Sequence, residues 1–598
     1  GIEPMEAARL GTAELAPAVI GTTLTTVVVL FPLAFLSDVV GDFFRALAFT
    51  LTAAVVISLA VALVLIPLVP LRKAKLAPRE QGREPSVLTS RLSRRLLRRP
   101  ALTVGFFVLI ALSGVAIFPR VQRGFLPTMD EGAFVLDYFL PAGTSLEATE
   151  TFARGLEGEL RKTPEVLTFS RRLGAELGPA AATELNTGDI MVRLRAKRSR
   201  SSDEVISELR SKIAAEFPEV RIEFVQVLQD VLNDLAGNPR PVEVKLLGPD
   251  FVRLNAFGEK LAERLEHVPG VVDVYAGHEH EVPELRFRAR RDALARFGST
   301  AEELSRQLET ALRGVTVGSV RRFDRLVNVR VRYPNPVRFN PLALLKTPFS
   351  VAGKTSTLEA MAVPELAAGE PELAHEGLSP MVAVTADLEG RDLGSVAADV
   401  GRAANELRLP TGYRAVVAGQ LEGQRATLRN LSLVAAFATL LVFTVLSVQF
   451  RRVRLALLVL LSVPLAIVGA LFGLFLTATA LNASSLMGIV LLVGLVVKNG
   501  VLLLEEAEKR FDRGETPSDA IAGATERRLR PVIMTTAATL VGLLPLALGI
   551  GSGVELQRPL AIAVIFGLLS STVATLGLLP SLALVALETS AKPAPRAN

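Results

Sequence analysis

Eight apolar runs of about 20 residues constrain this chain more than any other feature. Stretches of that length and hydrophobicity can cross a lipid bilayer as α-helices. Mean hydropathy is +0.41 and half of the residues are hydrophobic, which is typical of a membrane protein with a soluble region attached. The predicted spans are Leu15–Leu36, Phe44–Val69, Ala101–Phe118, Leu431–Phe450, Leu455–Thr477, Leu486–Leu504, Pro531–Ile550 and Leu560–Ala586.

The loop between the second and third runs predicts the orientation of the chain. Residues 71–100 carry ten Lys and Arg against two Glu, and the positive-inside rule places such loops in the cytoplasm. Alternating the spans from there puts Phe450–Arg454 inside and the uncharged Thr477–Ser485 outside. We therefore expect both chain ends in the cytoplasm and residues 119–430 on the far side.

One predicted span contains a charge. From Leu486 to Leu504 every residue is apolar or Gly except Lys498 and Asn499. A lysine at the bilayer centre costs about 2.5–3.5 kcal/mol. The alternative is that its side chain snorkels to an interface, but Lys498 lies about two helical turns before the next charged residue, Glu505. A partner carboxylate that loses its charge on protonation would release the lysine and favour another packing. Lys498 is therefore a candidate proton-coupling residue.

The region between the third and fourth spans is typical of folded α/β structure. Short β-rich runs alternate with amphipathic helical patterns, and none of this region is of low complexity. That spacing predicts split βαβ units with helices on one face of each sheet. The predicted fold class is thus a polytopic α-helical bundle, with eight spans present, carrying α+β extracytoplasmic domains of split βαβ type. That about twelve spans exist in all, and that these are porter and docking domains, is implied by the internal repeat and by the family resemblance below.

The same patterns predict the domain boundaries. Strands from 132 to 282 should form two porter units, and strands from about 380 to 424 should return to complete the first of them by pairing within 132–200. The expected segments are 1–70 (two spans), 71–100 (basic cytoplasmic linker), 101–118 (span), 119–282 (porter), 283–379 (docking), 380–430 (return to the porter), 431–588 (five-span bundle) and 589–598 (cytoplasmic tail).

The segment 1–70 recurs near the end of the chain at a fixed offset of 513. Thr22 falls on Thr535, Arg45 on Arg558, and Pro67 on Pro580, with no gap. Matched polar and Pro positions through loops make chance similarity improbable. The duplication predicts a fragment: a missing N-terminal half, with a counterpart of the segment 101–513, should precede Gly1 in a considerably longer parent.

Several motifs resemble the inner-membrane permeases of the resistance-nodulation-division superfamily, from before the fifth helix to the end. Those of the superfamily are Met487–Arg510 ("MGIVLLVGLVVKNGVLLLEEAEKR"), Arg527–Gly553 and Gly553–Pro580. Three further stretches resemble its heavy-metal efflux branch: Phe125–Gly132 ("FLPTMDEG"), Phe224–Gly237 and Leu409–Gln424.

The resemblance implies a proton-driven antiporter that works as a homotrimer in the bacterial inner membrane. It also implies a periplasmic membrane-fusion adaptor and an outer-membrane channel as partners. In the superfamily, carboxylates of the fourth helix, which this chain lacks, pair with a lysine of the tenth, and Lys498 matches that lysine. Arg528 and Thr535 match the accessory relay positions. The open alternatives are that Arg528 is an ordinary cytoplasmic-edge arginine and that Thr535 bonds its own helix.

The kind of ion transported is predicted from the carboxylates of the porter region. Soft-metal members of the branch share a Met cluster in the porter cleft, and here only Met191 falls in the matching neighbourhoods. Those neighbourhoods carry Asp137, Asp189, Asp230 and Asp234 instead. Oxygen ligands suit Zn²⁺ or harder divalent ions, whereas thioethers select Cu(I). The alternative is that these residues are solvated surface carboxylates.

Other functions remain open from the sequence. A drug or lipid exporter of the same superfamily would line its cleft with Phe and Leu. A non-transporting receptor or scaffold on the same fold would not need Lys498, and a protein-translocation subunit would have shorter extracytoplasmic domains. The sequence has no Cys, no phosphate-cradling loop and no catalytic-triad pattern, so we expect no enzyme activity, no cofactor and no nucleic-acid partner.

Overall fold

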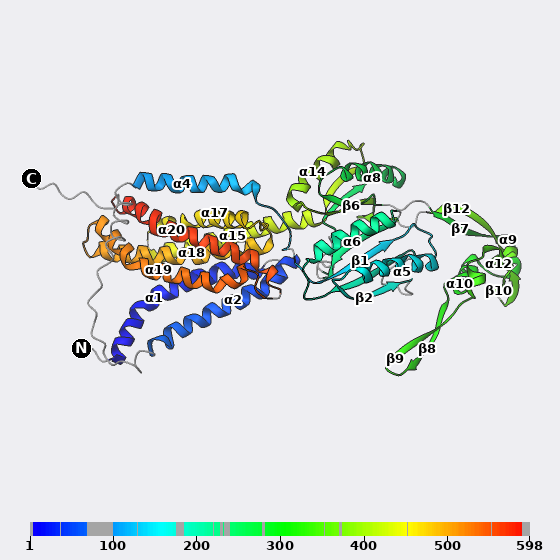
Figure 1. Cartoon of the computed structure of the whole chain (residues 1–598), viewed down its shortest axis with the longest axis horizontal. Helices are drawn as coiled ribbons and strands as arrows, with labels where there is room; N and C mark the ends of the chain where they lie inside the picture. Colours follow the sequence, from blue (N-terminus) through cyan, green and yellow to red (C-terminus); the bar gives the residue numbers. More distant parts are fainter. Residues whose placement is uncertain are drawn as a thin grey trace, which may run out of the picture.

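The computed structural model is elongated, with a helical bundle at one end, an α/β region in the middle and a smaller module at the other end (Figure 1). The chain begins its first helix and ends its last helix at the end of the bundle remote from the α/β region. The described residues are 4–35, 38–68, 100–127, 129–174, 185–218, 220–227, 231, 240–277, 282–351, 353–369, 373–450, 452–551 and 553–588.

Seven helices of the described residues are long and apolar enough to cross a membrane. The remaining prediction, Leu15–Leu36, corresponds to a shorter apolar helical stretch, Val19–Phe35. The bundle consists of α1 (Pro4–Leu30), η1 (Phe31–Phe35), α2 (Asp38–Val64), η2 (Ile66–Leu68), α4 (Pro100–Ile117), η4 (Phe118–Arg120), α15 (Gln420–Phe450), α16 (Val453–Leu460), α17 (Ser462–Leu476), α18 (Ala483–Asp512), α19 (Pro517–Ala547), η5 (Val554–Leu556) and α20 (Arg558–Glu588).

Helix α18 is the centre of the bundle. In its most apolar window 72% of the residues are buried, against 6% for the Phe44–Val64 span in α2. Close approach between helices depends on small residues: a Cβ added at Gly567 of α20 would lie 2.2 Å from Leu492 of α18. Likewise, a Cβ at Gly469 of α17 would lie 2.3 Å from Ser570 of α20. Larger side chains at these two glycines would push the helices apart.

The first α/β unit spans residues 133–226. Its four strands are antiparallel in the order β2-β3-β1-β4, and two helices cover one face. Alternation along β1 sends Phe134, Leu136 and Tyr138 to the helix side, where they are fully buried. The elements are β1 (Ala133–Phe139), α5 (Leu146–Lys162), β2 (Val166–Leu173), β3 (Thr187–Leu194), α6 (Ser202–Glu216) and β4 (Arg221–Gln226).

The second α/β unit is assembled from two separated segments, 242–275 and 375–418, and has a hydrophobic core of its own. Its main strands repeat the arrangement of the first unit, in the order β6-β14-β5-β15. The elements are β5 (Val242–Leu247), α8 (Phe251–Glu266), β6 (Val271–Tyr275), β13 (His375–Glu376), β14 (Ser379–Leu388), α14 (Leu393–Glu406) and β15 (Arg414–Ala418).

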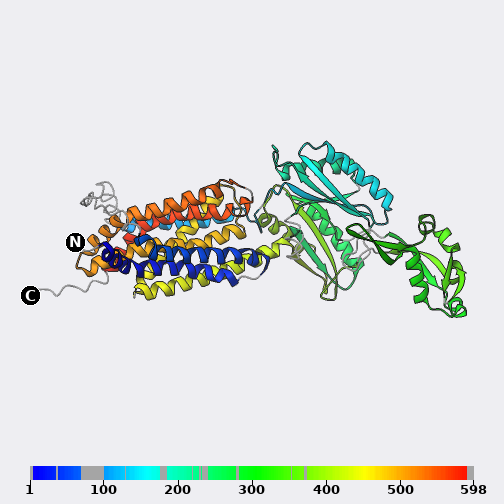
Figure 2. The ribbon, with the colours of Figure 1, turned by 90° about the horizontal axis from the view of Figure 1, so that it is seen from below.

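The expectation that residues 380–424 complete the first unit is therefore wrong. Strands β14 and β15 both pair with β5, not with a strand of 132–200. The physical reason is that the first unit already has its four strands, whereas β5 has a free edge on each side until the returning segment arrives. Figure 2 shows the two units lying side by side beyond the bundle.

The distal module is inserted between β6 and β13 of the second unit. A two-stranded stalk of β7 and β12 leads to it, and a long hairpin of β8 and β9 projects from it (Figure 1). The elements are β7 (Val282–Ala289), α9 (Arg291–Phe297), α10 (Ala301–Leu312), β8 (Val315–Arg322), β9 (Arg325–Val331), α11 (Asn335–Arg338), α12 (Pro341–Lys346), β10 (Pro348–Val351), β11 (Lys354–Thr357), α13 (Leu358–Met361) and β12 (Ala362–Gly369).

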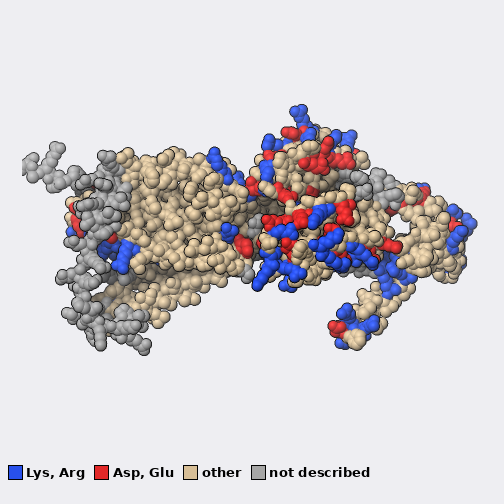
Figure 3. Space-filling view, in the orientation of Figure 1, with Lys and Arg blue, Asp and Glu red and all other residues tan. Residues whose placement is uncertain are grey.

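Charged side chains divide the molecule into the same regions. Figure 3 shows a broad band of uncharged surface over the bundle, whereas Lys, Arg, Asp and Glu crowd the α/β region. An uncharged lateral surface suits hydrocarbon, and the strand edges of the α/β units need water or protein partners. The bundle is therefore the membrane part of a multi-pass protein, and the α/β units lie outside the bilayer.

Candidate functional site

Lys498 lies on the open stripe of α18. Between Val490 and Ala507 every residue is buried except Leu491, Leu495, Lys498, Leu502 and Glu505, which recur at the spacing of one helix face. Lys498 is the exposed member of that stripe, and no carboxylate among the described residues pairs with its ammonium group. The helix therefore presents its one mid-span charge on the only side that the described helices leave uncovered.

The C-terminal end of the open stripe, at Glu505, is polar. The side chain of Gln449 on α15 donates a 2.6 Å hydrogen bond to Glu505, and the same Gln449 packs against Gly21 of α1, where an added Cβ would lie 3.0 Å away. Three helices thus meet around Glu505, about two turns from Lys498. This contact fixes α18 against α1 and α15 without neutralising the lysine.

Arg528 belongs to an arginine cluster around Glu506. The carboxylate of Glu506 lies 3.1 Å from Arg527, 3.3 Å from Arg510 and 3.9 Å from Arg528. Glu506 is 8% exposed, and the Nε of Arg528 is buried without a hydrogen-bond partner among the described residues. The cluster joins α18 to α19. Arg528 is therefore not a solvated edge residue, although no described contact links it to Lys498.

Thr535 bonds the backbone of its own helix, which is one of the two alternatives that the sequence leaves open. Its hydroxyl donates to the carbonyl of Val532 at 3.0 Å within α19, and its side chain is otherwise exposed. The adjacent Thr536 is buried and bonds Thr572 of α20 at 2.9 Å. In this conformation the structure does not bring Lys498, Arg528 and Thr535 together.

Two of the predicted metal carboxylates stand side by side on the first sheet. Asp137 of β1 is the register partner of Asp189 on β3 and, on its other side, of Glu223 on β4. Cross-strand partners point to the same face, with Cβ atoms about 5 Å apart. This carboxylate row, Asp189–Asp137–Glu223, lies on the sheet face opposite α5 and α6.

Guanidinium groups neutralise both ends of the carboxylate row. Arg172 Nε lies 2.9 Å from each oxygen of Asp189. Glu223, which is almost completely buried, accepts from Arg221 at 2.6 Å and pairs with Arg240. Bare carboxylates placed directly opposite each other would repel. The arginines explain how three of them share one sheet face.

The described residues contain no group of three or more metal-ligating side chains arranged to hold an ion. Asp137 and Asp189 do lie together, as the sequence suggested, but Arg172 occupies the oxygens of Asp189. Asp230 and Asp234 fall outside the described residues. Met191 is 45% exposed and lies on β3, two positions after Asp189 and on the same face of the sheet.

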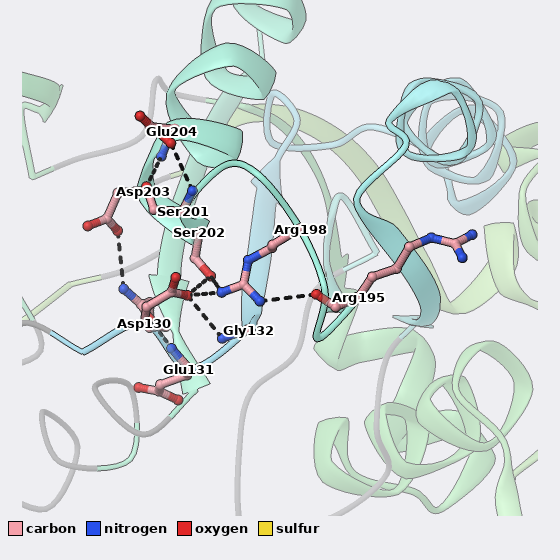
Figure 4. A network of polar contacts seen from close by, with 10 residues as sticks. Asp130, Glu131, Gly132, Arg195, Arg198, Ser201, Ser202, Asp203 and Glu204 are labelled. Carbon is pink, nitrogen blue, oxygen red and sulfur yellow. Dashed lines mark hydrogen bonds and ion pairs between the residues drawn. The ribbon is translucent and has the colours of Figure 1, made fainter. Parts of the chain in front are cut away.

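A second polar network anchors the segment that leaves the membrane (Figure 4). Asp130 accepts hydrogen bonds from Arg198, from Ser202 at the start of α6, and from the backbone of Gly132. Burial raises the pKa of Asp130, but the hydrogen bond from Ser202 and the charge of Arg198 outweigh it, so the pKa lies below the usual value. The network holds β1, and hence Asp137, in place.

Glu223 and Glu506 do not stand out in the sequence. Glu223 sits in the alternating run "RIEFVQ", which places it on a polar face but cannot say which strand lies beside it. Glu506 follows Glu505 in the last turns of α18, and its neighbours Arg527 and Arg528 belong to another helix. The sequence signal for the ion pairs of Glu506 is weak: two carboxylates near the end of one helix precede a run of basic residues in the next.

The chain matches known proteins over almost its whole length. The AcrB/AcrD/AcrF family matches residues 1–586. The cobalt-zinc-cadmium resistance protein CzcA of Cupriavidus metallidurans is 28% identical over 588 residues, 95% of this chain and 55% of CzcA. The multidrug resistance protein MdtC of Escherichia coli is 28% identical over 601 residues, 96% of this chain and 57% of MdtC.

A crystal structure of a heavy metal efflux pump has the same fold. It superposes with a TM-score of 0.81 at 27% identity, over 96% of this chain and 58% of that one. The chain spans about half the length of the curated relatives it matches. Together with the helical bundle, the paired α/β units and the charged residue in α18, this match over residues 1–586 shows that the chain belongs to the AcrB/AcrD/AcrF family of resistance-nodulation-division permeases.

Proposed function

We propose that this chain forms the second half of a proton-driven efflux permease that exports divalent metal cations. The observation that carries the proposal is the placement of Lys498, a charge on the open stripe of an otherwise buried membrane helix. Ionisable residues inside a membrane bundle are costly and mark proton or ion pathways. Family membership supports the same function.

In this proposal a carboxylate from sequence outside the chain packs against the open stripe. With the carboxylate ionised, its charge attracts Lys498 and the two helices close. Protonation removes the attraction, and the released lysine then favours a different packing of the helices. Arg528 and Thr535 serve as accessory relay residues, and the arginine cluster around Glu506 keeps α18 and α19 moving together.

Divalent ions of the zinc class are the proposed cargo. Three observations support them: the carboxylate row on the first sheet, the absence of Cys from the sequence, and the names of relatives such as CzcA. A carboxylate row offers oxygen ligands to borderline and hard ions. For Asp189 to bind metal, Arg172 must first swing away from its two oxygens. Asp230 and Asp234 are proposed as further ligands.

The proposed assembly is a homotrimer in the bacterial inner membrane, with the α/β units in the periplasm. The β8–β9 hairpin supports it, because one face bears Val315, Val320, Val327, Val329 and Val331, all exposed. An apolar face on a projecting arm needs a cover, and a second copy of the chain supplies one. The distal module is proposed as the docking domain for a membrane-fusion adaptor and an outer-membrane channel.

The test is transport by the intact permease reconstituted in liposomes. We expect Zn²⁺ or Co²⁺ movement to follow an imposed pH gradient and to carry protons in the opposite direction. If a hydrophobic dye moved with the gradient and the metal ions did not, the result would support the alternative of drug export. The similarity to MdtC favours testing that alternative. Absence of gradient-driven movement of either would refute the transport proposal.

A further inference from the structure

The two α/β units meet at unpaired strand edges. β4 is the outer strand of the first sheet and β6 is an outer strand of the second, and the two lie beside each other. Adjacent free edges tend to pair and merge two sheets into one. Among the described strands, however, no pairing joins β4 to β6. The interface must therefore be held by side chains.

A bulge prevents the two edges from pairing. The register between β6 and β14 breaks between Thr385 and Asp387, leaving two residues of β6 opposite Ala386. One of them, Asp273, has φ of 50°, in the left-handed region that a non-glycine residue seldom adopts. Bulges and inward-pointing charges are devices that stop an edge from pairing. Asp273 supplies both.

Helix α6 of the first unit contacts that bulge directly. Arg210 Nε lies 2.9 Å from Asp273, and another nitrogen of the same guanidinium lies 3.6 Å from Glu389, which follows β14. Ser207, one turn earlier on α6, donates a 2.6 Å hydrogen bond to Glu389. These contacts bind one face of the first unit to the edge of the second.

Arg240, in the connection between the units, makes the other half of the interface. Its guanidinium pairs with Glu223 of β4 and lies 3.6 Å from Asp387 of β14. Arg221 of β4 stacks over the ring of Tyr275 on β6, with 4.0 Å to the ring centre. Arg240 thus bridges β4 of the first unit to β14 of the second, and Arg221 joins β4 to β6.

We call these ionic residues the interface cluster: Arg210, Arg221, Glu223, Arg240, Asp273, Asp387 and Glu389. It contains four carboxylates and three guanidinium groups, so one negative charge is left over when all are ionised. The apolar cores of the two units are separate. Ionic contacts rather than hydrophobic packing therefore control whether the units stay together.

We propose that the interface cluster is a proton-binding latch, which takes up one proton when the two α/β units close against each other and releases it when they part. The proton resides on Asp387, a largely buried carboxylate of β14 that lies 3.6 Å from Arg240 and next to the bulge at Asp273. This site lies outside the membrane and is distinct from Lys498, so it stands whether or not metal export is correct.

The direction of the pH effect follows from burial. Burial, together with the charge of Asp273, raises the pKa of Asp387 to about 6 against the opposing effect of Arg240 and Arg210. Burial also raises the pKa of Asp273. When the units part, water returns and the pKa of Asp387 falls towards its ordinary value of 3.8. Closure is therefore favoured most below pH 3.8, and this contribution is lost as the pH rises through about 6.

The test measures the separation of the units in the membrane-inserted protein. The sequence contains no cysteine, so spin labels can be placed at Thr151→Cys on α5 and Lys260→Cys on α8, both exposed. We expect the closed-to-open ratio to fall by up to about tenfold per pH unit between about pH 4 and 6 and to level off above. In Asp387→Asn the units should remain closed across this range, and the steep fall of the ratio with pH should be lost.

Asp399→Asn is the matched control. Asp399 lies on α14 of the same unit, where Arg391 and Arg402 hold it by ion pairs outside the interface, so this variant should titrate like the unchanged protein. Infrared spectra give a second readout: the carbonyl band of a protonated carboxyl group should disappear near pH 6 only when Asp387 is present. Separation that is independent of pH, or titration that persists unchanged in Asp387→Asn, would overturn the latch.

Discussion

The membrane bundle and the α/β region treat charge in opposite ways. In the bundle, Lys498 lies on an open stripe with no carboxylate partner among the described residues. In the α/β region, buried carboxylates such as Glu223 and Asp273 are held by arginines of neighbouring elements. The difference teaches that the α/β units complete their own electrostatics, whereas the bundle presents a charge that no described residue satisfies.

The comparison has an energetic basis. A charge in hydrocarbon has no water to solvate it, so it persists only where a partner or a water-filled path is provided. Outside the bilayer, water competes for every ion pair, and a buried pair is worth keeping only if its geometry is good. The bundle charge is thus a requirement for a function, and the α/β charges are requirements for a particular arrangement of sheets.

Removal of the bundle charge should have the largest effect on transport. In the intact permease, Lys498→Met keeps the length of the side chain but removes the group that responds to a protonated carboxylate. We expect gradient-driven export to fall by about 100-fold or more, equivalent to about 2.7 kcal/mol. The measurement is metal-coupled proton flux in liposomes.

Lys509→Met is the control for that variant, since Lys509 is an exposed lysine in the last turns of the same helix. It should transport normally. Full activity of Lys498→Met would erase the contrast between the two regions, because the open charge would then have no role in coupling.

Removal of a compensated charge from the α/β region should reduce stability instead of coupling. Glu223→Gln leaves Arg221 and Arg240 without their buried partner, and we expect the first unit to lose about 3 kcal/mol, the lower limit for breaking a buried pair, because both arginines are partly exposed. Amide hydrogen exchange of β1 and β4 reports the loss.

The matched surface substitution is Glu150→Gln on α5, which breaks only the exposed pair with Arg154. Its amide exchange should not change measurably. Equal effects of the two substitutions would mean that burial does not distinguish the ion pairs of this region.

The projecting hairpin tests whether the α/β region, too, depends on another chain. Val320→Asp places a charge on the apolar face of the arm, and we expect the trimer to dissociate at least about tenfold more readily, because a buried unpaired charge opposes association. Ser319→Asp, on the other face of the same strand, should leave assembly unchanged. Native mass spectrometry measures both, and a trimer that tolerates Val320→Asp would remove the arm from the interface.

The smallest expected effect is on the carboxylate row. Asp137→Asn removes the central charge while Arg172 and Arg221 keep Asp189 and Glu223 in place, so we expect metal affinity to fall only about tenfold, or about 1.4 kcal/mol. Isothermal titration with Zn²⁺ provides the measurement. Asp324→Asn, at the exposed tip of the hairpin, serves as the reference, and an unaltered affinity in Asp137→Asn would argue against the row as a binding site.

The sequence predicts the bundle better than the sheets. Apolar runs are local signals, so each helix and the charge at Lys498 are visible within a window of about 20 residues. Sheet pairing is not local: the run "PMVAVTADL" alternates as a strand should, yet its partner β5 lies far earlier in the chain, on the other side of an inserted module. Nothing in the alternation of one strand specifies which edge it will join.

The same limit applies to the sites. Lys498 stands out because one charge interrupts an apolar helix, and the structure places it on an open face. Asp137 and Asp189 were identified by matching neighbourhoods, but their pairing with each other and with Glu223 depends on register. Arg172, which occupies Asp189, comes from another strand, and Arg240, which pairs with Glu223, comes from the connection, so neither contact could be read from spacing.

The two-stranded stalk of the distal module has a consequence for how such proteins diversify. Val282 and Gly369 are register partners at its base, so the chain leaves and re-enters the second unit at neighbouring points. An excursion with adjacent ends can be shortened, lengthened or exchanged without disturbing the host sheet. Evolution could therefore graft a different outward module onto an unchanged second unit, and a chimera that replaces residues 283–368 with the equivalent segment of a relative should keep the second sheet while presenting a different outward surface.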